Sequence, residues 1–219
     1  MSIPWLIVGG AGWTLSEYLI HRFVGHGPRR ARARSIAARL TPAGIAAEFN
    51  AEHLAHHANP MYFAPTSHKV IAAAAAVPAV AAALAPILGV RRAGSFAVGF
   101  TAVYAAYEIV HRRIHTHPPR GRYGRWVRRH HLLHHHRSPR ANHGVTTPSW
   151  DLVFGTKRPL ERLRVPRAIA PAWMIDPATG ELRGEHAADY ELWAREERVR
   201  DAPLARATEP RAAGGVTAD

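Results

Sequence analysis

Ten of the chain's 16 histidines stand in four clusters whose spacing suits metal binding. The chain has no cysteine, so a metal ion would have to be held by nitrogen or oxygen atoms. Ten neutral imidazoles exceed the needs of one tetrahedral ion, and two metal ions are therefore the simplest explanation. The clusters are an H-x4-H pair, an H-x2-HH triplet, an H-x3-H pair and a second triplet: His21 and His26; His53, His56 and His57; His111 and His115; His131, His134 and His135.

The spacing does not name the metal, because imidazole binds iron, zinc, copper and nickel. Zinc has no redox chemistry, whereas a dinuclear iron site in a membrane can activate O2 against an unreactive C–H bond. One cluster alone is commonly an accident of a polar helix face, and the run 130–136 alone is typical of a surface metal-scavenging tract. Four clusters together favour a dimetal site. The histidines outside the spacing stay unassigned: His68, His117, His130, His136, His143 and His186.

Each triplet predicts a helix that presents its imidazoles on one face. Residues at i, i+3 and i+4 of an α-helix lie on the same side, so His53, His56 and His57 are expected to converge. We expect Asn50 to cap the start of this helix and Asn59-Pro60 to end it.

The two histidines of the H-x4-H pair cannot share one face of a regular α-helix. Residues five apart on an ideal α-helix point about 140° away from each other. We therefore expect the first helix to unwind near Gly25, so that His21 and His26 share one site.

Three acidic residues lie close to the clusters in sequence: Glu17, Glu52 and Glu108. Carboxylates that accept ring N–H groups orient the ligands of metal sites, so these three are candidate orienting partners. Solvation of a helix face or ordinary ion pairing explains them about as well.

Three apolar runs precede or separate the clusters, at residues 3–20, 70–90 and 96–110. The first two are long enough as helices to cross most of a bilayer, and the last two form an expected hairpin turning at 91–95. Pro78 and Pro86 are tolerated where neighbouring helices satisfy the freed carbonyls. We expect the first run to be an uncleaved anchor, and the fold to be an all-α integral membrane helical bundle with about three transmembrane helices. Buried helices of a soluble α-bundle are the alternative.

Charge distribution predicts the sidedness of this bundle. The chain has 29 Lys and Arg against 16 Asp and Glu, a net charge of +13. Apart from Arg91 and Arg92, every Lys and Arg falls within residues 21–69 and 111–219. Three crossings put both stretches on one face, which the positive-inside rule makes cytoplasmic. We therefore expect a cytoplasmic-membrane protein whose histidines form a cytoplasmic cap against an anionic membrane surface. Nucleic-acid binding is disfavoured, since no recognition motif is visible.

Two segments around the clusters resemble a known family. Residues 48–60, EFNAEHLAHHANP, are similar to the region of the family's second motif, and residues 142–156, NHGVTTPSWDLVFGT, resemble its ending N-F-G-V-x-x-P-x-W-D-x-x-F-G-T. With the four-cluster order, the chain resembles the fatty acid hydroxylase superfamily of sterol desaturase-like membrane proteins over roughly residues 10–157. Its spacing is most similar to the fatty acid 2-hydroxylase branch.

The resemblance implies that the ten clustered histidines are the ligands of a dinuclear iron centre. It also implies that O2 is the oxidant, that a lipid or fatty acyl chain is hydroxylated, and that electrons come from a separate cytochrome b5-like or ferredoxin-like protein. Zinc is an expected substitute in purified protein. We expect three departures from the family: His143 where an aromatic is usual, no attached cytochrome b5-like domain and one helix before the first motif.

Other functions remain open at this stage. The same cage suits a desaturase, or a sterol or carotenoid hydroxylase, and a non-catalytic His-rich protein that binds or transports metal is a rival from another class. We expect a membrane-embedded domain at residues 1–157 and a peripheral cytoplasmic extension at 158–200, with a charged amphipathic helix over 181–200. Residues 201–219 are expected to be a disordered tail without an assigned function.

Overall fold

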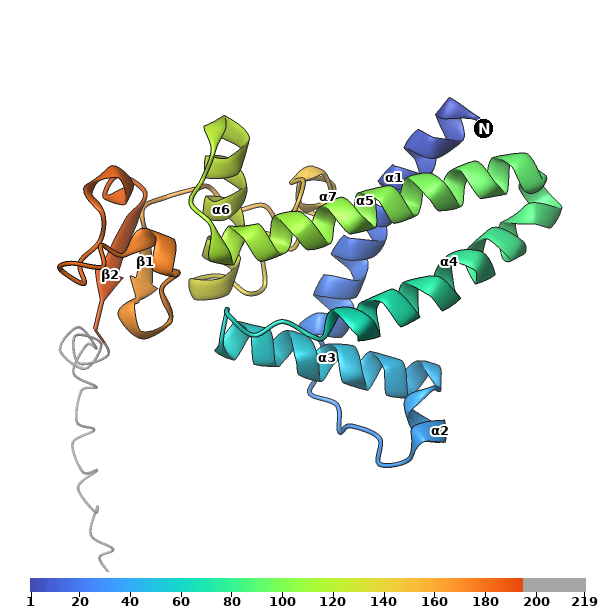
Figure 1. Ribbon diagram of the computed structural model, residues 1–219, viewed down its shortest axis with the longest axis horizontal. Helices are drawn as coiled ribbons and strands as arrows, with labels where there is room; N and C mark the ends of the chain where they lie inside the picture. The colour runs from blue at the N-terminus through green and yellow to red at the C-terminus, as the bar shows by residue number, and fades with distance from the viewer. Residues whose placement is uncertain (195–219) are drawn as a thin grey trace, which may run out of the picture.

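The chain is mostly helical in the computed structural model, which describes residues 1–194 apart from the side chain of Ala72 (Figure 1). The helical elements up to the last histidine cluster are α1 (Ile3–Leu19), the π-helix η1 (Ile20–Gly25), α2 (Ile36–Arg39), α3 (Pro42–Ala58), α4 (Thr66–Leu88), α5 (Val90–Thr116) and α6 (Gly121–His136). They are followed by α7 (Ser149–Val153), β1 (Leu163–Pro166), the short 3-10 helices η2 (Arg167–Ile169), η3 (Ala172–Met174) and η4 (Gly184–His186), and β2 (Tyr190–Trp193).

Helices α4 and α5 form the expected hairpin, and both are long and apolar enough to cross a membrane. The turn lies at Gly89, whose φ of 78° is a left-handed conformation that favours glycine. Our expected turn at residues 91–95 is wrong, because these residues form the first turns of α5. Pro78 and Pro86 lie inside α4, as expected. A third crossing by α1 stays a prediction.

Helix α1 packs along α5 with the two backbones in close approach. A Cβ atom on Gly9 would collide with the carbonyl of Phe96, and a Cβ on Gly99 would collide with that of Leu6. Small residues of this kind allow helices to pack closely in a membrane. Because the start of α1 lies beside the hairpin turn, with Arg91 donating a hydrogen bond to the Met1 carbonyl (3.1 Å), the other ends of the helices gather at the opposite pole.

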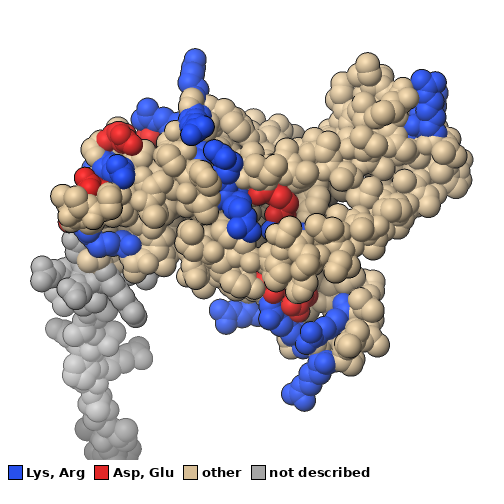
Figure 2. Space-filling view, viewed as in Figure 1, with Lys and Arg blue, Asp and Glu red and all other residues tan. Residues whose placement is uncertain are grey.

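The charged residues follow the same division. On the face in Figure 2, the hairpin shows Lys or Arg at its tip and then an uncharged surface. In sequence, residues 70–90 and 93–107 contain no Lys, Arg, Asp or Glu. The other charged side chains described on this face lie over the part of the molecule that carries α3, the start of α4, the end of α5, α6 and the C-terminal segment.

Helix α3 lies across the base of the hairpin and carries the first triplet (Figure 1). It begins earlier than expected, because the Thr41 hydroxyl accepts a hydrogen bond from Gly44 N (3.1 Å) and Pro42 occupies the first turn. The expected cap, Asn50, is wrong: this residue is buried in the middle of the helix. The end of the helix at Ala58, with Asn59 as its C-cap, is confirmed.

The segment after α7 packs against the face of α6 opposite its histidine triplet. Strands β1 and β2 pair in parallel, with Leu163 opposite Tyr190 and Val165 opposite Leu192. Leu163, Val165 and Tyr190 share a hydrophobic cluster with Leu132 and Leu133 of α6.

Within the described residues this small sheet corrects two expectations, the all-α fold and, as far as residue 194, the helix expected over residues 181–200. Tyr190 to Trp193 form a strand because they pair with β1, where alternate side chains are buried, whereas a helix would break that pairing. Residues from 195 onward, including the expected tail at 201–219, lie outside the described residues.

Candidate metal centre

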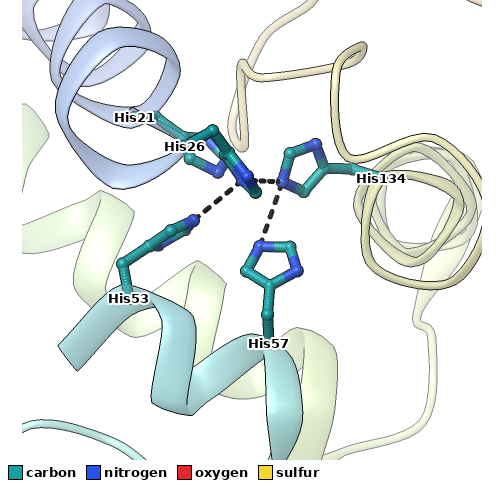
Figure 3. A group of neighbouring side chains, drawn as sticks. All are labelled: His21, His26, His53, His57 and His134. Carbon is teal, nitrogen blue, oxygen red and sulfur yellow. Dashed lines mark hydrogen bonds between the residues drawn. The ribbon is translucent and has the colours of Figure 1, made fainter. Parts of the chain in front are cut away.

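The H-x4-H pair is brought together by the π-helix η1. The N–H of His26 donates to the carbonyl of His21 (3.0 Å), five residues earlier, which is the π-helical hydrogen-bond pattern. The chain thus widens at the end of α1, where we expected unwinding near Gly25, and the two imidazoles face the same space (Figure 3).

Asn50 holds the end of this π-helix in place. Its side chain is 1% exposed, and its amide donates to the carbonyls of Val24 (2.9 Å) and Gly25 (3.0 Å). Its Oδ1 accepts a hydrogen bond from Arg30 N (3.2 Å). Because a helix end leaves carbonyls without partners, Asn50 supplies from α3 what the π-helix lacks.

The ten clustered histidines fall into two compact groups, in each of which the possible ligand atoms lie within 4.8 Å of one another. The first histidine group is His21, His26, His53, His57 and His134 (Figure 3). The second histidine group is His56, His111, His115, His131 and His135.

Each triplet is divided between the two groups. We expected the three imidazoles of α3 to converge, but His53 and His57 belong to the first group and His56 to the second. Helix α6 mirrors this division, with one histidine in the first group and two in the second. The pair at η1, His21 and the following His26, completes the first group, and the pair on α5 completes the second. Each group thus draws two histidines from one helical element, two from another and one from a third.

Nitrogen–nitrogen distances in the first group match those around a metal ion. The Nε2 atom of His26 lies 2.9 Å from the Nε2 atoms of both His53 and His134, and His134 Nε2 lies 3.2 Å from His57 Nε2. Nitrogens that bind one ion at about 2.0–2.1 Å are separated by about 2.9–3.4 Å in octahedral or tetrahedral geometry.

The second histidine group is similarly compact and lies against the first. Nε2 of His131 lies 3.1 Å from Nε2 of His115. The ring of His56 lies 4.7 Å from those of His111 and His115, measured between centroids. The rings of His57 and His135 stack at 4.0 Å between centroids, so the two groups share a wall.

The donor atoms fit two metal ions with nitrogen ligands. Nε2 atoms of His21, His56 and His135 are buried without a hydrogen-bond partner among the described residues. Burial lowers the pKa of His57 to about 2 and that of His56 to about 4, so these imidazoles are neutral at pH 7 and offer a lone pair. A metal ion would satisfy nitrogen atoms that otherwise face one another.

Backbone carbonyls orient the imidazoles, and the three acidic residues do not. The Nδ1 atoms of His21, His56 and His134 donate to carbonyls of His143 (2.5 Å), Tyr62 (2.8 Å) and Ala141 (2.7 Å). Such bonds fix the tautomer that leaves the lone pair on Nε2, the atom turned toward the other histidines.

The acids engage other partners. Glu17 accepts from Val145 N (2.5 Å), Glu52 from Arg32 and Tyr62, and Glu108 from Lys69. The prediction that these three carboxylates orient the histidine ligands is therefore wrong. The alternative of ion pairing fits Glu52 and Glu108.

The remaining histidines lie outside both groups. His143 is nearest, with its ring 5.4 Å from the rings of His21 and His134 between centroids. His130 is buried against Asp151 (3.4 Å), and His186 is buried against Trp173 in the C-terminal segment. His68 and His117 are exposed.

Sequence reasoning missed Asn50 and the carbonyls at 62, 141 and 143 as parts of this site. An asparagine inside a helix carries no signal for a partner on another segment, and a carbonyl belongs to every residue.

Comparison with known proteins places this geometry in context. The family model described as fatty acid hydroxylase matches residues 6–156. A dihydroceramide fatty acyl 2-hydroxylase of Arabidopsis thaliana is 29% identical over 70% of this chain and 60% of its own length. The fatty acid 2-hydroxylase of Rattus norvegicus is 30% identical over 71% of this chain and 40% of its own length. The chain thus spans about half the length of these relatives.

The fold is also similar to a solved structure of full-length scs7p in which only the hydroxylase domain is visible. The TM-score is 0.54 and the sequence identity 29%, over 71% of this chain and 55% of the other.

Proposed function

The chain belongs to the fatty acid hydroxylase family, and from this we propose that it is a membrane-bound oxidoreductase that inserts oxygen from O2 into a C–H bond of a lipid. A fatty acyl chain is the proposed substrate, because the relative from Arabidopsis is named as a dihydroceramide fatty acyl 2-hydroxylase and that from rat as a fatty acid 2-hydroxylase. The observation that carries the proposal is the pair of adjacent five-histidine groups.

The two histidine groups would each hold one metal ion, with all ten imidazoles as the proposed ligands. Iron is the proposed native metal, because bound iron supplies redox chemistry with O2 that side chains lack. Zinc would occupy the same nitrogen sites in purified protein without supplying that chemistry.

The chain's own residues preorganise the site. Helices α3 and α6 each contribute to both groups, so the groups keep a fixed separation. His115, His131 and His134 are no more than 1% exposed, which excludes bulk water from these three proposed ligands. Water exclusion matters because it limits side reactions of activated oxygen.

Aromatic residues line the second histidine group on its hairpin side. The ring of Tyr107 stacks on His111 at 5.6 Å between centroids, and Phe63 lies 5.2 Å from His56. We assign to these two rings the contact with the hydrocarbon chain of the substrate, since they come from segments that adjoin the apolar hairpin.

The partners follow from the same arrangement. The basic residues at the histidine-bearing end are proposed to face the anionic surface of a cytoplasmic membrane, with the site on the cytoplasmic side. Electrons are proposed to come from a separate cytochrome b5-like or ferredoxin-like protein.

Metal transport draws no support from the acidic residues near the apolar helices. A conduit needs ionisable groups along its path, whereas Glu17 is bonded to Val145 and Glu108 is paired with Lys69.

Lipid extracts from cells with and without the gene test the proposal. Mass spectrometry should show a lipid heavier by one oxygen atom only in cells that express the chain. His56→Ala should abolish this product, and His68→Ala, an exposed histidine outside both groups, should retain it. Equal product from His56→Ala with unchanged metal content would contradict the assignment.

A further inference from the structure

We propose that Asp151 is a positioning residue for the first histidine group alone, acting through the loop 141–147. The inference rests on the proposed two-metal assignment. It adds that Asp151 supports the metal position of the first group and not that of the second. Asp151 touches no histidine of either group, so its influence must pass through the loop.

The loop supplies two of the carbonyls that orient the first group. Ala141 O accepts from Nδ1 of His134, and His143 O accepts from Nδ1 of His21. A donating Nδ1 leaves the lone pair on Nε2, which is the atom turned toward the group. The position of two of the five imidazoles therefore depends on where this loop lies.

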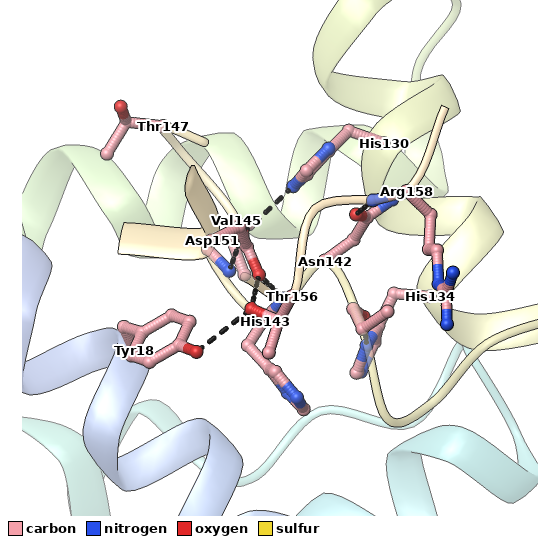
Figure 4. A network of polar contacts seen from close by, with 12 residues as sticks. Tyr18, His130, His134, Asn142, His143, Val145, Thr147, Asp151, Thr156 and Arg158 are labelled. Atoms are coloured by element: carbon pink, nitrogen blue, oxygen red, sulfur yellow. Dashed lines mark hydrogen bonds and ion pairs between the residues drawn. The ribbon is translucent and has the colours of Figure 1, made fainter. Parts of the chain in front are cut away.

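Asp151 holds the loop in place by accepting hydrogen bonds from its backbone (Figure 4). Its carboxylate is fully buried and accepts hydrogen bonds from His143 N (2.8 Å) and Gly144 N (2.9 Å). The Thr156 hydroxyl donates to the same carboxylate (2.7 Å), and Nε2 of His130 lies 3.4 Å from it. The backbone N–H bonded to Asp151 and the carbonyl bonded to His21 belong to the same residue, His143.

The loop is fixed at further points. Asn142 has a φ of 54°, in the left-handed region, which asparagine adopts more readily than most residues with a side chain. It is held by its N–H to Thr156 O (3.0 Å) and by its Oδ1, which accepts from Arg158 N (2.7 Å). A Cβ on Gly144 would collide with the Thr147 carbonyl, so the turn is closely packed as well.

The second histidine group has no comparable support from this loop. His56 takes its orientation from Tyr62 O (2.8 Å), on the segment after α3. Nδ1 atoms of His115, His131 and His135 are buried without a hydrogen-bond partner among the described residues. A change at Asp151 should therefore leave this group's metal unchanged.

Zinc binding by the purified full-length chain tests the inference. Asp151→Asn keeps the size of the side chain but removes its charge and one acceptor. Loss of a group that hydrogen-bonds to a metal ligand typically lowers metal affinity ten- to a hundredfold. We expect the lower end of this range, because Asp151 acts on His21 only through the backbone of His143. With zinc alone and a competing chelator, we expect one zinc at wild-type affinity and the other bound about tenfold more weakly.

Two variant backgrounds locate the weakened zinc. In a chain carrying His56→Ala and His135→Ala, only the first group is intact, and Asp151→Asn should weaken its zinc about tenfold. In a chain carrying His26→Ala and His53→Ala, only the second group is intact, and the same change should have no effect. Equal weakening in both backgrounds, or in neither, would overturn the proposal.

Two further variants separate positioning from general damage. Asp189→Asn alters another buried aspartate, which pairs with Arg125 and Arg129 and touches no clustered histidine, and it should leave both zincs unchanged. Thr156→Val removes one donor to Asp151 and should weaken only the first-group zinc, by less than Asp151→Asn does. This milder change decides the matter if Asp151→Asn does not fold.

The failure of this inference is distinguishable from the failure of the proposed function. Two zincs in the wild-type chain with unchanged binding in Asp151→Asn would overturn the role of Asp151 alone. A wild-type chain that binds no zinc at the ten histidines would overturn the two-metal assignment and this inference together.

Discussion

The Nε2 atoms of His26 and His134 lie 2.9 Å apart, although 108 residues separate them in the chain. One follows the π-helix at the end of α1, and the other lies near the end of α6. The first histidine group therefore closes only when segments from the first and last parts of the family-matched region are folded together. Metal binding at this group reports on the folding of that whole region.

Adjacent histidines on α6 should have separable effects. His134→Ala should remove the metal of the first group and His135→Ala that of the second, because the two residues belong to different groups. Each variant should retain about one ion per chain and lose lipid hydroxylation. Metal analysis of both purified variants, beside His68→Ala, checks this. Full metal content in both would contradict the division.

Asn50→Ala should loosen the first group without touching a ligand. The change leaves the buried carbonyl of Gly25 without its donor and leaves that of Val24 with Gly27 N alone, at a cost of about 1–3 kcal/mol in the free energy of unfolding. His26 loses its fixed position as a consequence. Thermal unfolding and zinc content measure the two effects. Ile45→Ala, at an exposed position of the same helix, is the control and should change neither.

Helix α5 offers a matched pair of glycines. Gly99→Ala should destabilise the chain by about 1–3 kcal/mol, because its Cβ meets the Leu6 carbonyl of α1. Gly94→Ala places its Cβ in open space and should be neutral or slightly stabilising. Melting temperatures in detergent distinguish them. Equal melting temperatures for the two variants would argue against the close α1–α5 packing.

Metal removal should lower stability, since ions that bind only the folded chain stabilise it. At a hundredfold excess over the dissociation constant, each ion contributes about 2.7 kcal/mol. A chelator should lower the melting temperature of the wild-type chain, and added zinc should restore it. For His134→Ala the difference should be smaller. A chelator-independent melting temperature would mean that the histidines bind no ion in the folded state.

The sequence identifies the ten histidines because their spacing is local to each helix. It does not reveal how each triplet divides between two groups, since His56 and His57 are neighbours on one face, and only the opposing helices decide which group each joins. The π-helix is a related case: the H-x4-H spacing indicates a departure from α-helical geometry near Gly25, but the stabilising side chain of Asn50 comes from α3.

The acidic residues show the limit of proximity in sequence. Glu17 lies four residues before His21, which suggested a shared helix face, but it is bonded to Val145, which is 128 residues away. The strand at Tyr190 has a similar origin, because its four-residue pattern is weak and its pairing partner β1 lies far upstream. Long-range pairing of this kind leaves no local signature.

Anomalous X-ray scattering at the iron edge, from crystals of the iron-loaded chain, tests the two-metal site most directly. We expect two iron ions per chain, one in each histidine group, with imidazole nitrogens at about 2.0–2.2 Å. A single ion, or ions bound away from the ten histidines, would contradict this assignment.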